Sequence, residues 1–505
     1  MMRVMKLLCV AAIAGSMPAA RASAQKAVGY FEQSGDVGQP AIAGSTAYDP
    51  AAQSYTIVGS GTNMWETRDE FHFVWRKMTG DFIVRTHAAL QGTGVDPHRK
   101  IGWIIRKTLD ADSPYVDVAV HGDGLTSLQF RKTAGAITEQ IQSTVKGADV
   151  IQLAREGRTY TMSVARFGDT FTHNEVADID LGDDVYVGLF VCAHNSAVSE
   201  RAVFKNVRIV VPPREGWVPY RDYIGSNLEV MEVATGDRTV VSTSPISVQA
   251  PNWTRNGKAL IYNSEGKLYR FDLATRTATL LDTGFATSNN NDHVLSADGT
   301  MLGISHQPAE EERRSVVYTL PSSGGTPKRI TAKSPSYLHG WSPDAKFLVY
   351  TGGRNGEFDI YKIPVEGGEE IRLTTTTGLD DGPEYSSDGQ WIYFNSSRSG
   401  RMQIWRMKPD GSGQEQLTND EFNNWFPHLS PDGTVMTVLS FLADVKPEDH
   451  PFYRQVYIRL MQPDGTSPKV IGYVYGGQGT INVPSWSPDG KQIAFVSNTA
   501  LPAPH

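Results

Sequence analysis

Cysteine is scarce in this 505-residue chain, which contains two such residues, Cys9 and Cys192. Cys9 falls within a predicted leader, so the mature chain would keep a single thiol and could form no internal disulfide, even in a compartment that permits one. Cys192 ends the apolar stretch Val187-Gly-Leu-Phe-Val-Cys192. Apolar neighbours predict a buried, structural thiol instead of a nucleophile.

Long apolar segments are also missing. No stretch beyond the start of the chain reaches the roughly 18 apolar residues that a membrane span needs. The first residues are basic, and they precede the apolar run Leu7–Ala14 and the small-residue sequence Ala22-Ser-Ala24. This order is typical of a secretory signal peptide, which we place at residues 1–24. We therefore expect a periplasmic or secreted protein with no membrane span and no lipid anchor.

Clusters of positive charge and several catalytic motifs are absent. The formal net charge is −8, and removing three basic residues with the leader makes it about −11. Lys and Arg are scattered, which argues against nucleic acid as a partner. The sequence has no phosphate-binding Gly-rich loop, no Cys pair for zinc and no Gly-x-Ser-x-Gly elbow, so nucleotide and serine-hydrolase chemistry are excluded on motif grounds.

The second half contains one short motif six times. The copies are Asn252-Trp-Thr-Arg-Asn-Gly257, Val294-Leu-Ser-Ala-Asp-Gly299, Gly340-Trp-Ser-Pro-Asp-Ala345, Glu384-Tyr-Ser-Ser-Asp-Gly389, His428-Leu-Ser-Pro-Asp-Gly433 and Ser485-Trp-Ser-Pro-Asp-Gly490. The fifth residue of each copy serves as its marker; these residues are Asn256, Asp298, Asp344, Asp388, Asp432 and Asp489. The steps between successive markers are 42, 46, 44, 44 and 57 residues. This is the length of a four-stranded propeller blade. We predict a six-bladed β-propeller over residues 224–500, in which the Pro-Asp-Gly sequence is a structural turn.

The last copy leaves too few residues for a whole blade. Only Gln492–Ser497 can form a strand before the chain ends, and a blade without its other strands would expose an edge. The β-rich segment Leu228–Val241 has the features of half a unit. We predict that it closes the ring against the C-terminal strand.

The repeats resemble the PD40 units of TolB-type propellers, over about 270 residues in six registers. A sialidase Asp-box is a poorer match, because its Thr-Trp ending is absent. The resemblance implies a TolB-like six-bladed propeller and, as one interpretation, a non-enzymatic interaction scaffold with an envelope protein as partner. Nothing in the first half resembles the N-terminal α/β domain of TolB.

Residues 27–212 show short alternating strands separated by Gly and Asp turns, with hardly any helical period, which predicts an antiparallel two-sheet sandwich. The order of segments resembles concanavalin-like (lectin/glucanase-type) jelly rolls and implies carbohydrate binding. The segments that carry it are Gly61–Trp65, Asp69–Phe73, Gly80-Asp81, Gly102–Arg106 and Val187–Asn195. The Pro-rich residues 213–223 are the predicted linker.

Residues just before each marker are expected to meet at one mouth of the propeller channel. They are Asn252, His293, His339, Glu384, His428 and, in the last unit, Asn482 or Ser485. We take His339, His428 and Glu384 as candidate catalytic acid–base groups, and Asn252, His293 and Asn482 as candidate substrate ligands. Three imidazoles and a carboxylate could also bind a divalent metal. The alternative is that these groups are only solvated, since their distances to the marker differ and they need not point together.

Two weaker candidates complete the set. In the first domain, Trp65 and Arg106, with Arg68, Asp69 and His72 nearby, could hold a sugar or could be core residues. The long fifth step contains the insertion Phe441–Tyr453, which could form a lid or be a tolerated surface loop.

Oligogalacturonate lyases are similar propellers, and this resemblance implies a histidine-rich, metal-bearing centre that acts on acidic sugars. Theirs has seven blades, so only the idea of a central site carries over. The leading hypothesis from the sequence is an exported protein that binds, and on one interpretation cleaves, a carbohydrate by lyase or glycosidase chemistry. The alternative is the TolB-like scaffold.

Overall fold

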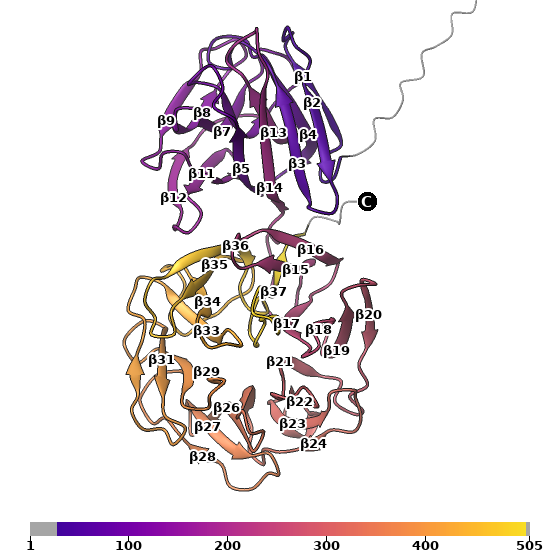
Figure 1. Cartoon of the computed structure of the whole chain (residues 1–505), viewed down its shortest axis with the longest axis vertical. Coiled ribbons are helices and arrows are strands. Elements are labelled where there is room, and N and C mark those ends of the chain that lie inside the picture. Colours follow the sequence, from indigo (N-terminus) through magenta and orange to yellow (C-terminus); the bar gives the residue numbers. More distant parts are fainter. Residues whose placement is uncertain (1–27, 501–505) are drawn as a thin grey trace, which may run out of the picture.

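The computed structural model describes residues 28–500, and the predicted leader at residues 1–24 lies outside the described residues. The fold class is all-β, as predicted. A two-sheet body precedes a ring of blades along the chain (Figure 1). Within the described part, the one helical element is a 3-10 turn, η1 (Ala309–Glu311).

The first body consists of two seven-stranded antiparallel sheets that face each other across one core, as in a β-sandwich. One sheet has the order β1 (Gln33–Val37), β4 (Phe71–Thr79), β13 (Asp184–Cys192), β6 (Lys100–Arg106), β7 (Tyr115–His121), β8 (Thr126–Arg131) and β9 (Glu139–Gln142). The other has the order β12 (Thr172–Val176), β11 (Thr159–Ala165), β10 (Val150–Glu156), β5 (Phe82–Gln91), β14 (Glu200–Val210), β3 (Ser54–Gly59) and β2 (Ser45–Asp49). Alternate apolar residues such as Trp103 and Phe204 meet between them, because successive side chains of a strand point to opposite faces. Cys192 is buried, as expected.

Five four-stranded blades follow. They are β17 (Gln249–Trp253), β18 (Ala259–Ser264), β19 (Lys267–Asp272) and β20 (Thr277–Leu280); β21 (Asn289–Leu295), β22 (Met301–His306), β23 (Val316–Pro321) and β24 (Lys328–Arg329); β25 (Ser336–Trp341), β26 (Phe347–Arg354), β27 (Glu357–Pro364) and β28 (Ile371–Arg372); β29 (Asp380–Tyr385), β30 (Ile392–Ser396), β31 (Gln403–Met407) and β32 (Glu415–Gln416); and β33 (Asn423–Leu429), β34 (Met436–Phe441), β35 (Arg454–Met461) and β36 (Lys469–Gly476).

The sixth blade joins the two ends of the propeller. Its order is β16 (Arg238–Ser244), β15 (Ser226–Glu232) and β37 (Gln492–Asn498), with Leu228 opposite Val496. The innermost position is reduced to a bridge between Trp486 and Ile493. The predicted closure is confirmed, because β15 supplies the β37 edge with a full antiparallel partner.

The marker residues form turns, as expected. In five of the six copies the marker is an aspartate, and its carboxylate accepts a 2.6 Å hydrogen bond from the serine two residues earlier. In the first copy Thr254 donates to Asn256 over 2.8 Å. An Asp or Asn side chain that binds groups of its own turn stabilises the chain reversal between two strands.

Each of the five complete blades has a β-bulge in its inner strand. The register against the second strand shifts in β17, β21, β25, β29 and β33. In β25, Leu338 lies opposite Tyr350 and Gly340 opposite Val349, which leaves His339 without a partner residue. A bulge redirects side chains on either side of it, and this decides which polar residues face the channel mouth.

The sandwich contacts the closing blade and the fifth blade directly. The Tyr473 hydroxyl on β36 donates to the backbone carbonyl of Asp169 over 2.6 Å, and the Phe171 amide donates to the Tyr457 hydroxyl over 3.1 Å. Arg208 on β14 forms an ion pair with Glu229 on β15 over 2.6 Å. The two bodies therefore share buried polar contacts beyond the chain that connects them.

Candidate functional site

A cavity of about 960 Å³ lies at the mouth of the propeller. Gln249, Asn291, Tyr337, Asp381 and Asn482, one residue from each of five units, contribute to its wall. Each stands seven residues before the marker of its unit. The position seven residues before the marker therefore contributes to the wall in all five of these units.

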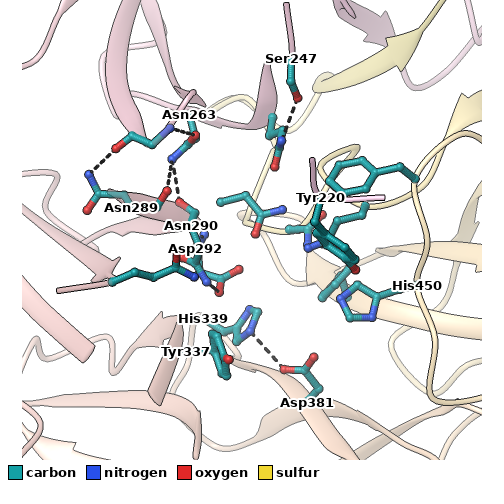
Figure 2. Close-up of a pocket in the computed structure, with 18 of the residues that line it drawn as sticks. Tyr220, Ser247, Asn263, Asn289, Asn290, Asp292, Tyr337, His339, Asp381 and His450 are labelled. Atoms are coloured by element: carbon teal, nitrogen blue, oxygen red, sulfur yellow. Dashed lines mark hydrogen bonds and ion pairs between the residues drawn. The ribbon is translucent and has the colours of Figure 1, made fainter. Parts of the chain in front are cut away.

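A charged centre lies in this wall, as Figure 2 shows. Nε2 of His339 lies 3.2 Å from Oδ1 of Asp381, which also accepts hydrogen bonds from the Thr351 hydroxyl at 2.6 Å and the Gly382 amide at 2.8 Å. Asp292 faces the same space, and its Oδ2 accepts a 2.5 Å hydrogen bond from the Asn290 side-chain amide. The imidazole of His339 is thus paired with Asp381, and the Asp292 carboxyl lines the same cavity.

The electrostatics of these three groups are coupled. Burial would raise the pKa of Asp381, but the hydrogen bond and charge of His339 outweigh it and hold that pKa at about 2. Burial raises the pKa of Asp292 to about 6, against the opposing effect of His339. Burial lowers the pKa of His339, yet Asp292 and Asp381 more than offset this, so its pKa lies above the ordinary value. The site favours an imidazolium beside an ionised Asp381.

Asparagines form a second part of the wall. The Asn263 side-chain amide donates to the backbone carbonyls of Asn289 and Asn290 over 3.1 and 2.7 Å, which fixes this corner. Oδ1 of Asn289 and Nδ2 of Asn291 are buried and have no hydrogen-bond partner within residues 28–500. Both residues line the cavity, and a buried polar group without a partner costs free energy. These two atoms have almost no accessible surface, so they lie within the wall and not at its face.

The linker and the insertion of the fifth blade form the remaining wall. Tyr220 and Tyr223 stack edge-to-face on Phe452, with ring centroids 5.3 and 5.6 Å apart. His450 packs on Trp425, with ring centroids 4.3 Å apart, and it lines the cavity together with Phe452 and Glu448 of the insertion. The insertion therefore borders the mouth, at the place where a lid would lie.

The other sequence-predicted residues of the propeller lie elsewhere. His428 and Glu384 form a pair, with Nδ1 of His428 2.6 Å from Oε2 of Glu384 and Nε2 2.6 Å from the carbonyl of Ile481. Nε2 of His293 lies 3.2 Å from the carbonyl of Ile261. The Asn252 amide donates to the carbonyl of Pro484 over 2.5 Å. These side chains connect neighbouring blades.

His339 and Asn482 are therefore the two predicted propeller residues that the structure brings to the mouth cavity. Asn252, His293, Glu384 and His428 do not line it, and neither does Ser485. The inner-strand bulges explain the difference. Within the described residues, no group of three or more His, Cys, Asp or Glu side chains is arranged to hold a metal ion.

In the sandwich, Arg106 belongs to a buried ion network. Asp69 accepts from Arg106 over 2.6 Å and from Arg131 over 2.7 Å, and all three side chains are fully buried. Trp65 is half-buried, and its backbone carbonyl accepts from the Thr138 amide over 3.0 Å. His72 lies 2.7 Å from Asp36. The geometry gives Arg106 a structural role and leaves Trp65 alone at the surface.

Sequence reasoning missed Asp292, Asp381, Asn291 and Tyr337, and it included His450 only as part of the insertion. A usable signal was present, because the residue seven before the marker is polar or aromatic in every unit while its identity changes from unit to unit. Adjacent polar pairs such as Asp380-Asp381 marked the same place. Which of these side chains face the cavity depends on β-bulges, and no residue pattern in the sequence indicates where a bulge lies.

The comparisons with known proteins agree with the blade geometry. A family model for the TolB β-propeller domain, PD40, matches residues 339–443. An uncharacterised protein of Agrobacterium fabrum, Atu1656, is 48% identical over 272 residues, which are 54% of this chain and 92% of the relative. The solved structure of a putative TolB from Agrobacterium tumefaciens is 46% identical, with a TM-score of 0.53, and the match covers 55% of this chain and 100% of that one.

An oligogalacturonate lyase in complex with manganese is 14% identical with a TM-score of 0.35, over 53% of this chain and 78% of that one, and this likeness carries no functional argument. Within residues 28–500 there is no helix with the length and hydropathy that crossing a bilayer would require. The high identity to the two Agrobacterium proteins, together with the six closed blades, identifies the chain as a member of the TolB-like PD40 β-propeller family.

Proposed function

We propose that this chain is an exported, periplasmic or secreted TolB-like protein whose propeller mouth binds a segment of an envelope protein, without chemistry of its own. The observation that carries the proposal is the mouth cavity. Its volume of about 960 Å³ lies within the range of about 300–1,000 Å³ typical of ligand sites, and polar and aromatic side chains from five units of the propeller line it.

Several features suit a polypeptide. A peptide backbone carries one donor and one acceptor per residue, and the carboxamide side chains that line the cavity, such as Gln249 and Gln478, carry both kinds of group. Tyr220, Tyr337 and Phe358 add aromatic surface, which is enriched where proteins bind one another. The relatives in Agrobacterium support the same interpretation, since one is named a putative TolB.

A second candidate function is carbohydrate binding, with the sandwich as a concanavalin-like jelly roll and the mouth holding the sugar. The observation in its favour is the same combination of aromatic rings and amides, which sugars also use. Catalysis by His339, Glu384 and His428 together has no geometric support, because the last two side chains are engaged with each other and with a backbone carbonyl away from the cavity. His339 with Asp381 would be the acid–base pair of such an enzyme.

The experiment is a quantitative pull-down from envelope extract with the mature protein as bait. Tyr337→Ala and Asn482→Ala alter the mouth, and Leu280→Ala, at an exposed position on the outer strand β20, is the matched control. We expect one stoichiometric protein that both mouth variants lose and the control retains. Recovery of the same proteins by all four baits would refute the mouth as the binding surface.

A glycan array and thermal shifts with oligosaccharides test the carbohydrate alternative. A response that disappears in His339→Ala but persists in His428→Ala would favour sugar binding at the mouth. No response of the unmodified protein would remove that alternative.

A further inference from the structure

The charges that line the mouth cavity are strongly unequal. Glu265, Asp292, Asp381 and Glu448 contribute carboxyl groups, and among the described residues no lysine or arginine lines the cavity. The imidazoles of His339 and His450 also line it, and that of His339 is already paired with Asp381. Carboxylates in a recess bordered by apolar rings attract a cation more strongly than exposed ones, because the field is less screened there.

Asp292 is the group that lacks a full set of partners. Its side chain lies in the wall and the residue is 5% exposed. Oδ2 accepts from the Asn290 amide, and among residues 28–500 no hydrogen bond to Oδ1 is formed. A buried carboxylate normally gains hydrogen bonds or an ionic partner.

We infer that the mouth recognises a basic side chain, a lysine or an arginine, carried by the polypeptide segment that it binds. The ammonium or guanidinium donates to Asp292 and to carboxamide oxygens of the wall, while Tyr337 and Phe358 contact its aliphatic stem. Aromatic faces also attract cations directly. The inference rests on the proposed function, since it names the chemistry of the ligand of that same site.

The same charges disfavour an acidic ligand. A uronate carboxylate in this cavity would face four carboxyl groups, with the imidazoles of His339 and His450 to offset them, and burial lowers the pKa of His450. Like charges placed together in a binding site reject the wrong partner. The acidic sugars suggested by the resemblance to oligogalacturonate lyases therefore do not suit this mouth.

Three acetylated and amidated pentapeptides test the inference by isothermal titration with the full mature chain. They have a central lysine, norleucine or glutamate between alanines, and spermidine is the free-cation probe. We expect the lysine peptide to bind at least about tenfold more tightly than the norleucine peptide, no binding of the glutamate peptide, and an affinity that falls with added salt. Spermidine binding that matches the lysine peptide would overturn the polypeptide part of the inference.

The variants are Asp292→Asn, Tyr337→Lys and the control Glu369→Gln, an exposed carboxylate outside the cavity. Asp292→Asn should reduce lysine-peptide affinity at least about tenfold. Tyr337→Lys places a positive charge in the cavity without removing a carboxylate, so it should do the same even if Asp292→Asn folds poorly. Glu369→Gln should bind as the unmodified protein does.

Equal binding of the lysine and norleucine peptides, or no effect of either mouth variant, would refute the inference. If mouth variants still lose a stoichiometric envelope protein in the pull-down, the proposed function survives that failure. If the lysine peptide binds as expected but no envelope protein depends on the mouth, the proposed function fails and the cation site remains.

Discussion

Glu229 connects the sandwich to the seam of the propeller, and replacing it with glutamine tests how the two ends of the ring are held. Its carboxylate accepts from Arg208 on β14 over 2.6 and 3.2 Å and from Arg238 on β16 over 2.6 and 3.0 Å. Ser497 on β37 donates to it as well. One fully buried carboxylate on β15 thus connects β14 of the sandwich with β16 and the C-terminal strand β37 of the closing blade.

Glu229→Gln leaves two buried guanidinium groups without an anion. Breaking a buried pair by removing one partner costs about 3–5 kcal/mol, because the remaining charge is uncompensated. We expect a loss of that size in the free energy of unfolding near pH 7. Glu232→Gln on the same strand is the matched control, since Glu232 is exposed, and such changes stay within about 0.5 kcal/mol.

The pH dependence gives a second readout. Burial would raise the pKa of Glu229, but Arg208 and Arg238 outweigh it and lower that pKa to about 2. A carboxyl whose pKa is lower in the folded state stabilises the fold above its unfolded pKa, and this contribution is lost as pH falls toward about 2. The difference between the unmodified protein and Glu229→Gln should therefore shrink between pH 4.5 and 2.

The assay is urea unfolding, followed by tryptophan fluorescence and far-UV circular dichroism, at several pH values. The combined variant Arg208→Met, Glu229→Leu and Arg238→Met should recover most of the lost stability, because a packed apolar cluster can replace a buried ion network. A loss below about 1 kcal/mol for Glu229→Gln, or one equal to that of Glu232→Gln, would refute the account of the seam.

Three further predictions concern the closure, the mouth and the sandwich. Deleting residues 494–505 removes most of β37, the partner of β15 along its whole length, so circular dichroism should show cooperative loss of the propeller; a fragment with unchanged melting would contradict this. Burial raises the pKa of Asp292 to about 6, against the opposing charge of His339. The affinity for the lysine peptide should therefore fall as pH drops through about 6, while Asp381, with a pKa of about 2, stays ionised. Titrations in which the affinity is flat from pH 7.5 to about 5 would argue against Asp292 as the ligand group. Burial raises the pKa of Asp117 to about 8, despite the opposing charge of Lys100. A carboxyl whose pKa is raised on folding makes the folded protein less stable as pH rises toward that value. Above pH 8, Asp117→Asn should therefore unfold at a higher urea concentration than the unmodified protein, and an equal or lower midpoint would disprove this.

The repeat was readable from the sequence because its turn has a fixed chemical requirement. Most copies place a serine hydroxyl, an aspartate carboxylate and a glycine where the chain reverses. Thr254 and Asn256 replace the first two groups in one copy, and Ala345 replaces the glycine in another. The closure was predictable as well, because a strand edge at Gln492–Asn498 had to be covered. The first feature depends on hydrogen bonds within a turn, and the second on the need of a strand edge for a partner.

The site was less predictable because it depends on bulges in the inner strands. His339 is itself the extra residue of such a bulge, whereas His428 lies beyond one and points toward Glu384. A strict alternation along the strand cannot assign these directions. The contribution of Tyr220 and His450 to the mouth was hidden for another reason, since a linker and an insertion meet there from distant parts of the chain.

Photocrosslinking from the mouth tests the central claim most directly. A photoreactive amino acid at Tyr337 faces the cavity, and one at Leu280 faces solvent from the outer strand β20. In the intact cell envelope we predict one major crosslinked protein from position 337 that is absent from position 280 and is reduced by Asp292→Asn. The same crosslinked products from both positions, or none from position 337, would contradict the claim that the propeller mouth binds an envelope protein.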